Sequence, residues 1–285
     1  MKQKISPIIK PEELISLRQA EDIVLIDASA GKVSQDRYKQ QHLDGAQYVD
    51  LDTQLANVGP DAAKGGRHPL PLPEQFSKTL SKLGISADSH VVVYDDKNGA
   101  NAASRFWWML RSAGHEHVQV LDGGFDAAVK AGFPVNADTV IPAKPGSYLF
   151  EKWLLPLADM DEVETLRFDK DHIVVDVRDQ VRYDGIKEPI DLIAGHIPGA
   201  VNIPFFSNLD ATGSFLSAQE LNKKYTEAFK GIDPENIIVH CGSGVTACHT
   251  LLALDQAGIE IPKLYVGSWS EWSRNDKPIG KKENG

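Results

Sequence analysis

The residues whose types and spacing suit chemistry lie in one stretch, 240–248, which reads His-Cys-Gly-Ser-Gly-Val-Thr-Ala-Cys. The apolar, β-branched run 236–240 predicts a strand, and the apolar spacing over 246–254 predicts a helix that ends at Gly258. Cys241 is therefore expected in a tight loop between a strand and the N-terminus of a helix.

A cysteine in this position is suited to nucleophilic attack. The first backbone N–H groups of a helix have no partner within the helix, so they favour an anion in the preceding loop, and the thiolate is the reactive form of cysteine. Gly242 and Gly244 lack Cβ atoms, which lets the loop adopt positive φ values and turn successive N–H groups inward. We expect Cys241 to be a nucleophile whose sulfur lies among N–H donors.

Three interpretations of the loop are open. In the first, Cys241 is a small buried apolar residue, which the neighbouring Gly-Ser-Gly disfavours. In the second, the loop belongs to a cysteine-dependent phosphatase, which needs an arginine six positions after the cysteine to clamp phosphate; that position is Ala247. The third is a resemblance: 241–246, Cys-Gly-Ser-Gly-Val-Thr, resembles the active loop of two-domain rhodanese-type sulfurtransferases, in the variant found in 3-mercaptopyruvate sulfurtransferases. Rhodaneses that act chiefly on thiosulfate typically carry basic residues where Gly242 and Ser243 stand.

The composition is that of a globular protein with more than one domain. The chain has 285 residues, 42% hydrophobic and 25% charged, which is enough for two domains of about 140 residues. The formal net charge of -10 disfavours nucleic acid or an anionic membrane as the main partner, because such binding needs a clustered basic surface. No apolar run approaches ~20 residues, so no membrane-spanning segment is expected.

Cysteine usage indicates a reducing compartment. Cys241 and Cys248 form no disulfide framework and match no zinc-binding spacing, so no metal site is expected. The beginning of the chain is interrupted by charges and prolines before a signal-peptide core would form. We therefore expect a cytoplasmic protein. Cys248 falls one turn into the predicted helix, where we expect it to be buried and inert.

Strands and helices are expected to alternate along both halves of the chain. The predicted strands are 23–26, 46–49, 91–94 and 118–121 in the first half, and 173–177, 200–203, 237–240 and 263–266 in the second. The clearest helices are 73–83, 102–113 and 217–231, the last opened by a capping box at Ser217 and Glu220. This alternation predicts an α/β fold with a mainly parallel sheet and helices on both faces.

The two halves also match residue by residue. His42-Leu-Asp-Gly-Ala answers His196-Ile-Pro-Gly-Ala, so both histidines are expected to be structural. Tyr94-Asp95 answers His240-Cys241. Two copies of one domain, with a cysteine in only the second, resemble the tandem rhodanese arrangement over nearly the whole chain.

The predicted organisation is an N-terminal rhodanese-like domain over 1–137, a linker over 138–155 and a catalytic rhodanese domain over 156–285. The linker is placed where prolines and glycine replace clear periodicity. The first domain is expected to be catalytically silent, because Asp95 cannot carry sulfane sulfur.

The resemblance also implies residues that serve the cysteine. Arg182 matches an arginine that holds the carboxylate or sulfonate of the donor, a task suited to the fork of a guanidinium. Mercaptopyruvate sulfurtransferases typically carry a second arginine shortly before Gly195, where this chain reads Glu-Pro-Ile-Asp-Leu-Ile-Ala. Lys187 is the nearest cation and is the candidate to replace that arginine in donor binding as a point charge. Within the loop, Ser243 is expected to donate a hydrogen bond to the sulfur or the donor, and Val245 and Thr246 complete the loop, Thr246 otherwise serving only as a helix N-cap.

Two residues of the first half resemble a proton relay. His68 and Asp52 match a histidine and an aspartate that relatives bring to the cleft, and Arg67 beside the histidine adds positive charge. The other interpretation of His68 is an exposed loop residue, since it precedes a proline and must be extended or in a turn.

The sequence thus predicts a two-domain sulfurtransferase with a ping-pong mechanism. Cys241 takes sulfur from 3-mercaptopyruvate or thiosulfate, and a thiol acceptor such as thioredoxin or a small dithiol, or cyanide, removes it. No metal or organic cofactor is required. The alternative is a regulatory or sulfur-carrying module that holds persulfide for a partner without rapid turnover.

Overall fold

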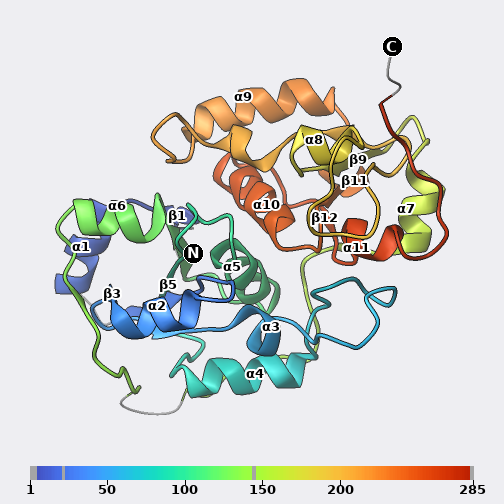
Figure 1. Ribbon diagram of the computed structural model, residues 1–285. Helices are drawn as coiled ribbons and strands as arrows, with labels where there is room; N and C mark the ends of the chain where they lie inside the picture. Colours follow the sequence, from blue (N-terminus) through green and yellow to red (C-terminus); the bar gives the residue numbers. More distant parts are fainter. Residues whose placement is uncertain (1–4, 21–22, 143–145, 283–285) are drawn as a thin grey trace. The chain divides into compact units, whose positions relative to one another are not determined.

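The computed structural model describes residues 5–20, 23–142 and 146–282, which form two compact units (Figure 1). The first unit contains the chain up to Ala56 together with Pro71–Leu154 and Ala211–Phe215. The second unit contains Asn57–Leu70, Leu155–Asp210 and the chain from Leu216 onward. The units thus exchange two short segments relative to the contiguous domains that the sequence predicts, and the boundaries at 137 and 155 stay a prediction. Residues 1–4 at the beginning of the chain and residues 143–145 of the predicted linker lie outside the described residues.

The first unit is built on a five-stranded parallel sheet with the order β1-β6-β5-β2-β4. Its strands are β1 (Ile8–Ile9), β2 (Ile23–Asp27), β4 (Gln47–Tyr48), β5 (His90–Tyr94) and β6 (Val118–Leu121), and an antiparallel pair joins β3 (His42–Leu43) to β7 (Val135–Asn136). Its helices are α1 (Pro11–Ala20), α2 (Ser34–Gln40), α3 (Leu51–Gln54), α4 (Pro73–Lys82), α5 (Ala103–Ser112) and α6 (Gly124–Lys130).

The second unit repeats this sheet in the order β8-β12-β11-β9-β10, again with all strands parallel. Its strands are β8 (Leu157–Ala158), β9 (Ile173–Asp176), β10 (Val201–Asn202), β11 (Ile237–His240) and β12 (Lys263–Tyr265). Its helices are α7 (Met160–Leu166), α8 (Gln180–Tyr183), α9 (Ala218–Phe229), α10 (Thr246–Gln256) and α11 (Ser268–Trp272), with 3₁₀ turns η1 (Phe205–Asn208) and η2 (Pro234–Asn236).

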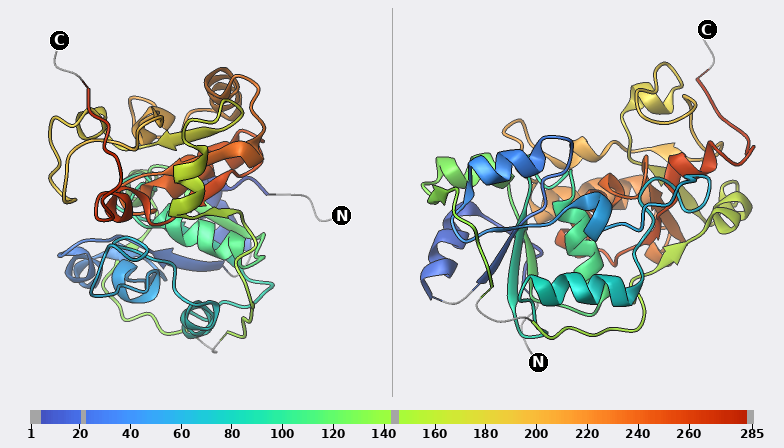
Figure 2. Two further views of the ribbon diagram at one scale, coloured as in Figure 1. Left: turned by 90° about the vertical axis from the view of Figure 1, so that its right-hand side faces the viewer. Right: turned by 60° about the horizontal axis from the view of Figure 1, so that its bottom comes forward.

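Both sheets are covered on their two faces, as the apolar strands predict. In β5, Val92 and Tyr94 pack with Leu14 of α1 and Ala128 of α6. Helix α5 packs against the other face of this sheet (Figure 2), on the side to which the alternate residues of a strand point. The same strand in the second unit, β11, is buried along its whole length. The predicted α/β fold with mainly parallel sheets and helices on both faces is confirmed.

The edge strands β1 and β8 are not expected from the sequence, because two-residue strands show no alternation. Two helices were easier to predict. Trp107 and Trp108 of α5 are fully buried, as expected of core residues, and Ser217 and Glu220 form the predicted capping box on α9. Parallel strands place their carboxyl ends along one edge of a sheet. In the second unit that edge brings Asp176, at the end of β9, opposite His240, at the end of β11.

Candidate active site

The cysteine loop leaves the carboxyl end of β11 and enters α10. Cys241 is 1% exposed, and α10 begins at Thr246 with Val245 in the N-cap position. Gly244 has φ +72, and a Cβ there would lie 2.7 Å from the carbonyl oxygen of Val266, so only glycine fits. The expectation of a positive φ is confirmed for Gly244 and was wrong for Gly242, which does not adopt the left-handed region.

The turn between β12 and α11 holds the backbone of this loop. The Cys241 N–H donates to Ser268 Oγ at 3.2 Å, and the Cys241 carbonyl accepts from the Trp269 N–H at 3.0 Å. The next carbonyl, that of Gly242, accepts from the Ser270 N–H at 2.9 Å. These bonds use the first N–H groups of α11 to fix the two residues at the start of the loop.

Segment 57–70, which belongs to the second unit, brings a histidine to the loop. His68 Nδ1 lies 2.7 Å from Ser243 Oγ, within hydrogen-bond distance. Two bonds anchor the segment: the Gly65 N–H donates to Glu271 Oε1 at 2.7 Å, and the Arg67 N–H donates to Ser270 Oγ at 3.0 Å. Ser243 is 5% exposed whereas His68 is partly exposed, so the hydroxyl is shielded from water and the imidazole is not.

The close approach of segment 57–70 depends on glycine. Gly66 has φ +80, and a Cβ there would lie 2.4 Å from the carbonyl oxygen of Gly267 in the turn before α11. The run Gly65-Gly-Arg-His in the sequence is therefore the local signal for this contact.

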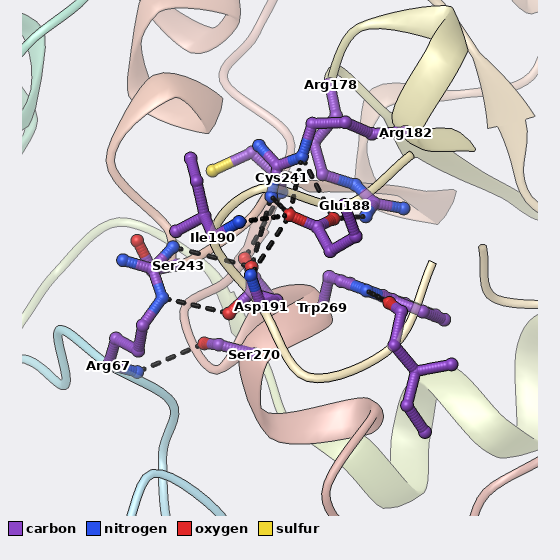
Figure 3. A network of polar contacts seen from close by, with 12 residues as sticks. Arg67, Arg178, Arg182, Glu188, Ile190, Asp191, Cys241, Ser243, Trp269 and Ser270 are labelled. Atoms are coloured by element: carbon purple, nitrogen blue, oxygen red, sulfur yellow. Dashed lines mark hydrogen bonds and ion pairs between the residues drawn. The ribbon is translucent and has the colours of Figure 1, made fainter. Parts of the chain in front are cut away.

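A set of ion pairs extends from the end of β9 to the cysteine loop, and we call it the arginine network (Figure 3). Its first half is buried: Arg178 Nη2 lies 2.6 Å from Asp176 Oδ2, and Arg178 Nη1 lies 3.3 Å from Glu188 Oε2. The Arg178 guanidinium also lies over the ring of Trp269, 4.7 Å from its centroid. Glu188 in turn binds Arg182, with Nη2 2.8 Å from Oε1.

Asp191 forms the other half of the network. Its side chain is fully buried, and Oδ2 lies 3.1 Å from Arg182 Nη2 while Oδ1 lies 2.9 Å from Arg67 Nε. Arg274 Nη1 lies 3.4 Å from Oδ1. A Cβ on Gly242 would lie 3.2 Å from Arg67 Nη2 and 3.3 Å from Arg182 Nη2. Two guanidinium groups therefore converge on the residue that follows Cys241, and Gly242 is small to leave them room.

Burial and ion pairing set the charges of the network. Burial by itself would raise the pKa of Asp176, but the Arg178 guanidinium outweighs it and holds this pKa below its ordinary range. In the same way, Arg182 holds the pKa of the buried Glu188 side chain below its ordinary range. Burial lowers the pKa of His240, the last residue of β11, so its imidazole is neutral near pH 7.

The other predicted site residues lie as follows. Arg182 lies beside Gly242, whereas Lys187 is exposed and Arg67 supplies the second cation there. Asp52 is exposed on α3 of the first unit, and its part in a proton relay stays a prediction. Cys248 is fully buried in α10, with Sγ 3.3 Å from the Gly244 carbonyl oxygen, as expected of an inert thiol.

The sequence pointed to Arg182, His68 and Arg67 but not to the buried acids that hold the arginines. Asp191 and Glu188 lie in the stretch noted only for its missing arginine. Asp176 lies near the end of the predicted strand 173–177, and Arg178 follows it. The one signal in the sequence for their ion pair was this pair of opposite charges at the carboxyl end of a parallel strand.

The corresponding loop of the first unit surrounds the carboxylate of its own residue Asp95. Asp95 follows β5 as Cys241 follows β11, and it is fully buried. Its Oδ1 accepts from the N–H groups of Lys97 and Gly99, and its Oδ2 accepts from those of Asn101 and Ala103, at 2.8 to 3.1 Å. The loop after the central strand thus collects N–H donors around an anion in the copy that lacks cysteine.

The matching histidines have the same surroundings in both units. His42 Nδ1 and His196 Nδ1 each lie 2.7 Å from the carbonyl oxygen of a tyrosine, Tyr38 and Tyr183, and each imidazole stacks on the ring of that tyrosine. This repeated contact supports a structural role for both histidines.

Within residues 5–20, 23–142 and 146–282, no group of three or more histidine, cysteine, aspartate or glutamate side chains is arranged to hold a metal ion. No helix in these ranges is long and apolar enough to span a membrane.

Comparison with known proteins places the chain in a family. The model of the rhodanese-like domain matches it twice, over residues 10–131 and 159–275. A protein of Pseudomonas aeruginosa named "Probable 3-mercaptopyruvate sulfurtransferase" is 39% identical over 239 residues, which cover 82% of each chain. The thiosulfate sulfurtransferase of Gallus gallus is 36% identical over 249 residues, covering 85% of this chain and 81% of the relative.

The fold agrees with that of a solved relative. The structure of 3-mercaptopyruvate sulfurtransferase from Leishmania major superimposes with a TM-score of 0.83 at 29% identity, covering 95% of this chain and 75% of the other. With two matching domains, identities above 30% over most of the chain and the same fold, this protein belongs to the rhodanese-like family, in its two-domain form.

Proposed function

We propose that this protein is a sulfurtransferase in which Cys241 carries sulfur from 3-mercaptopyruvate or thiosulfate to a thiol. The observation that carries the proposal is the convergence of Arg67 and Arg182 on Gly242, because it places two anion-binding groups beside the residue that follows the cysteine. The names of the relatives, which include both 3-mercaptopyruvate and thiosulfate sulfurtransferases, support the same chemistry.

The reaction proceeds in two steps. The Cys241 thiolate attacks the sulfur of 3-mercaptopyruvate, the C–S bond breaks, and its electron pair remains on carbon as the enolate of pyruvate, which takes up a proton. With thiosulfate the thiolate attacks the outer sulfur, the S–S bond breaks, and sulfite leaves. In both cases Cys241 becomes a persulfide. An acceptor thiolate then attacks the outer sulfur of the persulfide and releases the Cys241 thiolate.

We assign the transfer of the proton to Ser243 and His68. Ser243 follows Gly242, on which the two arginines converge. The 2.7 Å contact of its hydroxyl with His68 Nδ1 links it to a partly exposed imidazole that can exchange protons with water. We assign Asp52 to the same relay on the resemblance alone. Gly244 and Val245 shape the turn that leads into α10, and Thr246 is the first residue of that helix.

The donor is held by its anionic group. Arg182 is the principal anchor and Arg67 the second, so that Lys187 is not needed for this task. Both donors are expected to be used, with 3-mercaptopyruvate preferred by a modest factor, because the neutral Gly242-Ser243 pair adds no cation for a doubly charged thiosulfate.

The acceptor is a dithiol, either a small molecule or a thioredoxin-like protein, and cyanide serves in an assay. A dithiol is favoured because its second thiol releases the transferred sulfur as sulfide and closes an intramolecular disulfide. We place this reaction in the cytoplasm, since the two cysteines form no disulfide and Cys241 has to remain reduced.

Steady-state sulfide release with each donor and dithiothreitol tests the proposal. Multiple turnovers per Cys241 with at least one donor are expected, and Arg182→Lys is expected to reduce kcat/KM for both donors by ~10-fold or more, because a point charge does not replace the guanidinium fork. A single stoichiometric transfer to Cys241 without further turnover would instead favour the persulfide carrier. Release of phosphate from a phosphomonoester would favour the phosphatase.

A further inference from the structure

The carboxylate of Asp191 lies beside Gly242, where the proposed function puts the anionic group of the donor. Its Oδ2 is 3.4 Å from a Cβ placed on Gly242, at the same point on which Arg67 and Arg182 converge. The side chain is fully buried and bridges these two arginines, and its own N–H donates to Glu188 Oε1 at 3.0 Å. The chain thus supplies a negative charge of its own at the anion-binding point.

The negative charge of Asp191 reduces the net positive charge of the arginine network. Its ion pairs join four guanidinium groups to three carboxylates: Arg67, Arg178, Arg182 and Arg274, and Asp176, Glu188 and Asp191. His240 and Tyr183 also interact with Asp176. His240 is neutral near pH 7 because burial lowers its pKa, and Tyr183 is neutral because burial and the nearby carboxylates raise its pKa. The network therefore holds one uncompensated positive charge.

One positive charge is matched by a donor with one negative charge. The carboxylate of 3-mercaptopyruvate brings a single charge, whereas thiosulfate brings two and would leave the buried network with a net negative charge. In a site of low exposure an unmatched charge is costly, since the side chains of Asp191, Glu188 and Arg182 are 0%, 3% and 14% exposed.

We propose that Asp191 is the specificity-determining residue that sets the charge of the accepted donor, because its carboxylate cancels one guanidinium charge beside Gly242 and favours a singly charged donor over a doubly charged one. This inference rests on the proposed sulfurtransferase function. It concerns the selection of the donor and leaves the nucleophile and the proton relay unchanged.

The substitution Asp191→Asn tests it with little change of shape. The amide keeps one oxygen that accepts from an arginine, and the network gains a second positive charge. The ratio of kcat/KM for thiosulfate to kcat/KM for 3-mercaptopyruvate is expected to rise by about tenfold, since a dianion gains twice the interaction of a monoanion. Asp179→Asn is the matched control, because Asp179 is exposed and its side chain makes no capping bond at the start of α8; the ratio should stay within about twofold.

A second variant changes the charge in the opposite direction. Arg274 contacts Asp191, its atoms are not among the three nearest to a Cβ placed on Gly242, and it is partly exposed at 22%. Arg274→Gln removes one positive charge, so the same ratio is expected to fall. If both variants lower kcat/KM equally for the two donors, Asp191 only positions the arginines and the proposal is wrong.

Anion binding without turnover separates this proposal from the function on which it rests. Alkylation of Cys241 by the neutral reagent iodoacetamide is measured with increasing sulfate or acetate. In Asp191→Asn the sulfate concentration that halves the rate should fall by about a hundredfold and the acetate concentration by about tenfold, which is the same tenfold change in their ratio. This result without turnover of either donor would overturn the proposed function alone, whereas equal shifts for sulfate and acetate would overturn the role of Asp191.

Discussion

His68 Nδ1 lies 2.7 Å from Ser243 Oγ, although 175 positions separate the two residues in the chain. The contact exists because segment 57–70 packs in the second unit, where Gly66 meets the carbonyl of Gly267. A residue from the first repeat is therefore part of the polar surroundings of the cysteine loop in the second.

This pair is expected to act as one unit. Ser243→Ala and His68→Gln should each reduce kcat/KM by roughly 10- to 100-fold, the loss typical of a hydrogen bond that serves the reacting group. The double variant should be little worse than either single variant, because the second substitution removes a partner that is already inactive. A double-mutant cycle on kcat/KM for 3-mercaptopyruvate measures this coupling, and simple additivity would show that the two side chains act independently.

The two cysteines should differ completely in their effect on transfer. Cys241→Ser is expected to abolish sulfur transfer, because a serine hydroxyl does not form a persulfide. Cys248→Ser should keep most of the activity, since its side chain is buried in α10 and bonds to the Gly244 carbonyl. Sulfide release and circular dichroism of both variants check this, and an equal loss of activity in two folded variants would contradict the assignment of Cys248 as inert.

A basic residue at position 242 should impair this site. Gly242→Lys places a Cβ 3.2 to 3.4 Å from Arg67, Arg182 and Asp191, and it brings a third cation to two that are already close. We expect kcat/KM to fall for both donors by ~10-fold or more and the melting temperature to fall as well. Gly59→Lys is the control, because nothing lies within 4 Å of its added Cβ. A Gly242→Lys enzyme that gains thiosulfate activity would show that Arg67 and Arg182 move aside.

The stability of the protein should show a pH dependence that originates from Asp95 of the first unit. Burial raises the pKa of Asp95 to about 6 in the folded protein, in spite of four N–H bonds, against an ordinary value of 3.8. Between these values the folded state binds more protons than the unfolded state, so stability from this group increases as the pH falls. From pH 7.5 to pH 5 the gain is about 1.4 kcal/mol.

Asp95→Asn removes this titration. The free energy of unfolding of the wild type minus that of the variant should therefore be higher at pH 5 than at pH 7.5 by that amount. Urea unfolding of both proteins at the two pH values measures it. A difference that is the same at both pH values would show that Asp95 remains ionised, held by its four N–H bonds, over the whole range.

Much of the fold and part of the site were predictable from the sequence. β11 has the predicted bounds, Ser217 caps α9 as expected, and the two sheets repeat one strand order, because these features depend on local apolar period and turn residues. The cysteine loop and Arg182 were recognisable for a similar reason, since the residues that identify them are neighbours in the chain. The family and the sulfurtransferase class followed from these motifs and are confirmed by the comparisons.

Only the tertiary structure decided how the charges around the cysteine are arranged. Arg67 and Asp191 are 124 positions apart, yet their ion pair determines what lies beside Gly242. Read along the chain, Lys187 is closer to Arg182 than Arg67 is, but its side chain is exposed while segment 57–70 carries Arg67 to the loop. Local sequence determines which elements form, whereas long-range packing selects which charged side chains meet in a buried space, because only there does an unpaired charge cost enough to fix their positions.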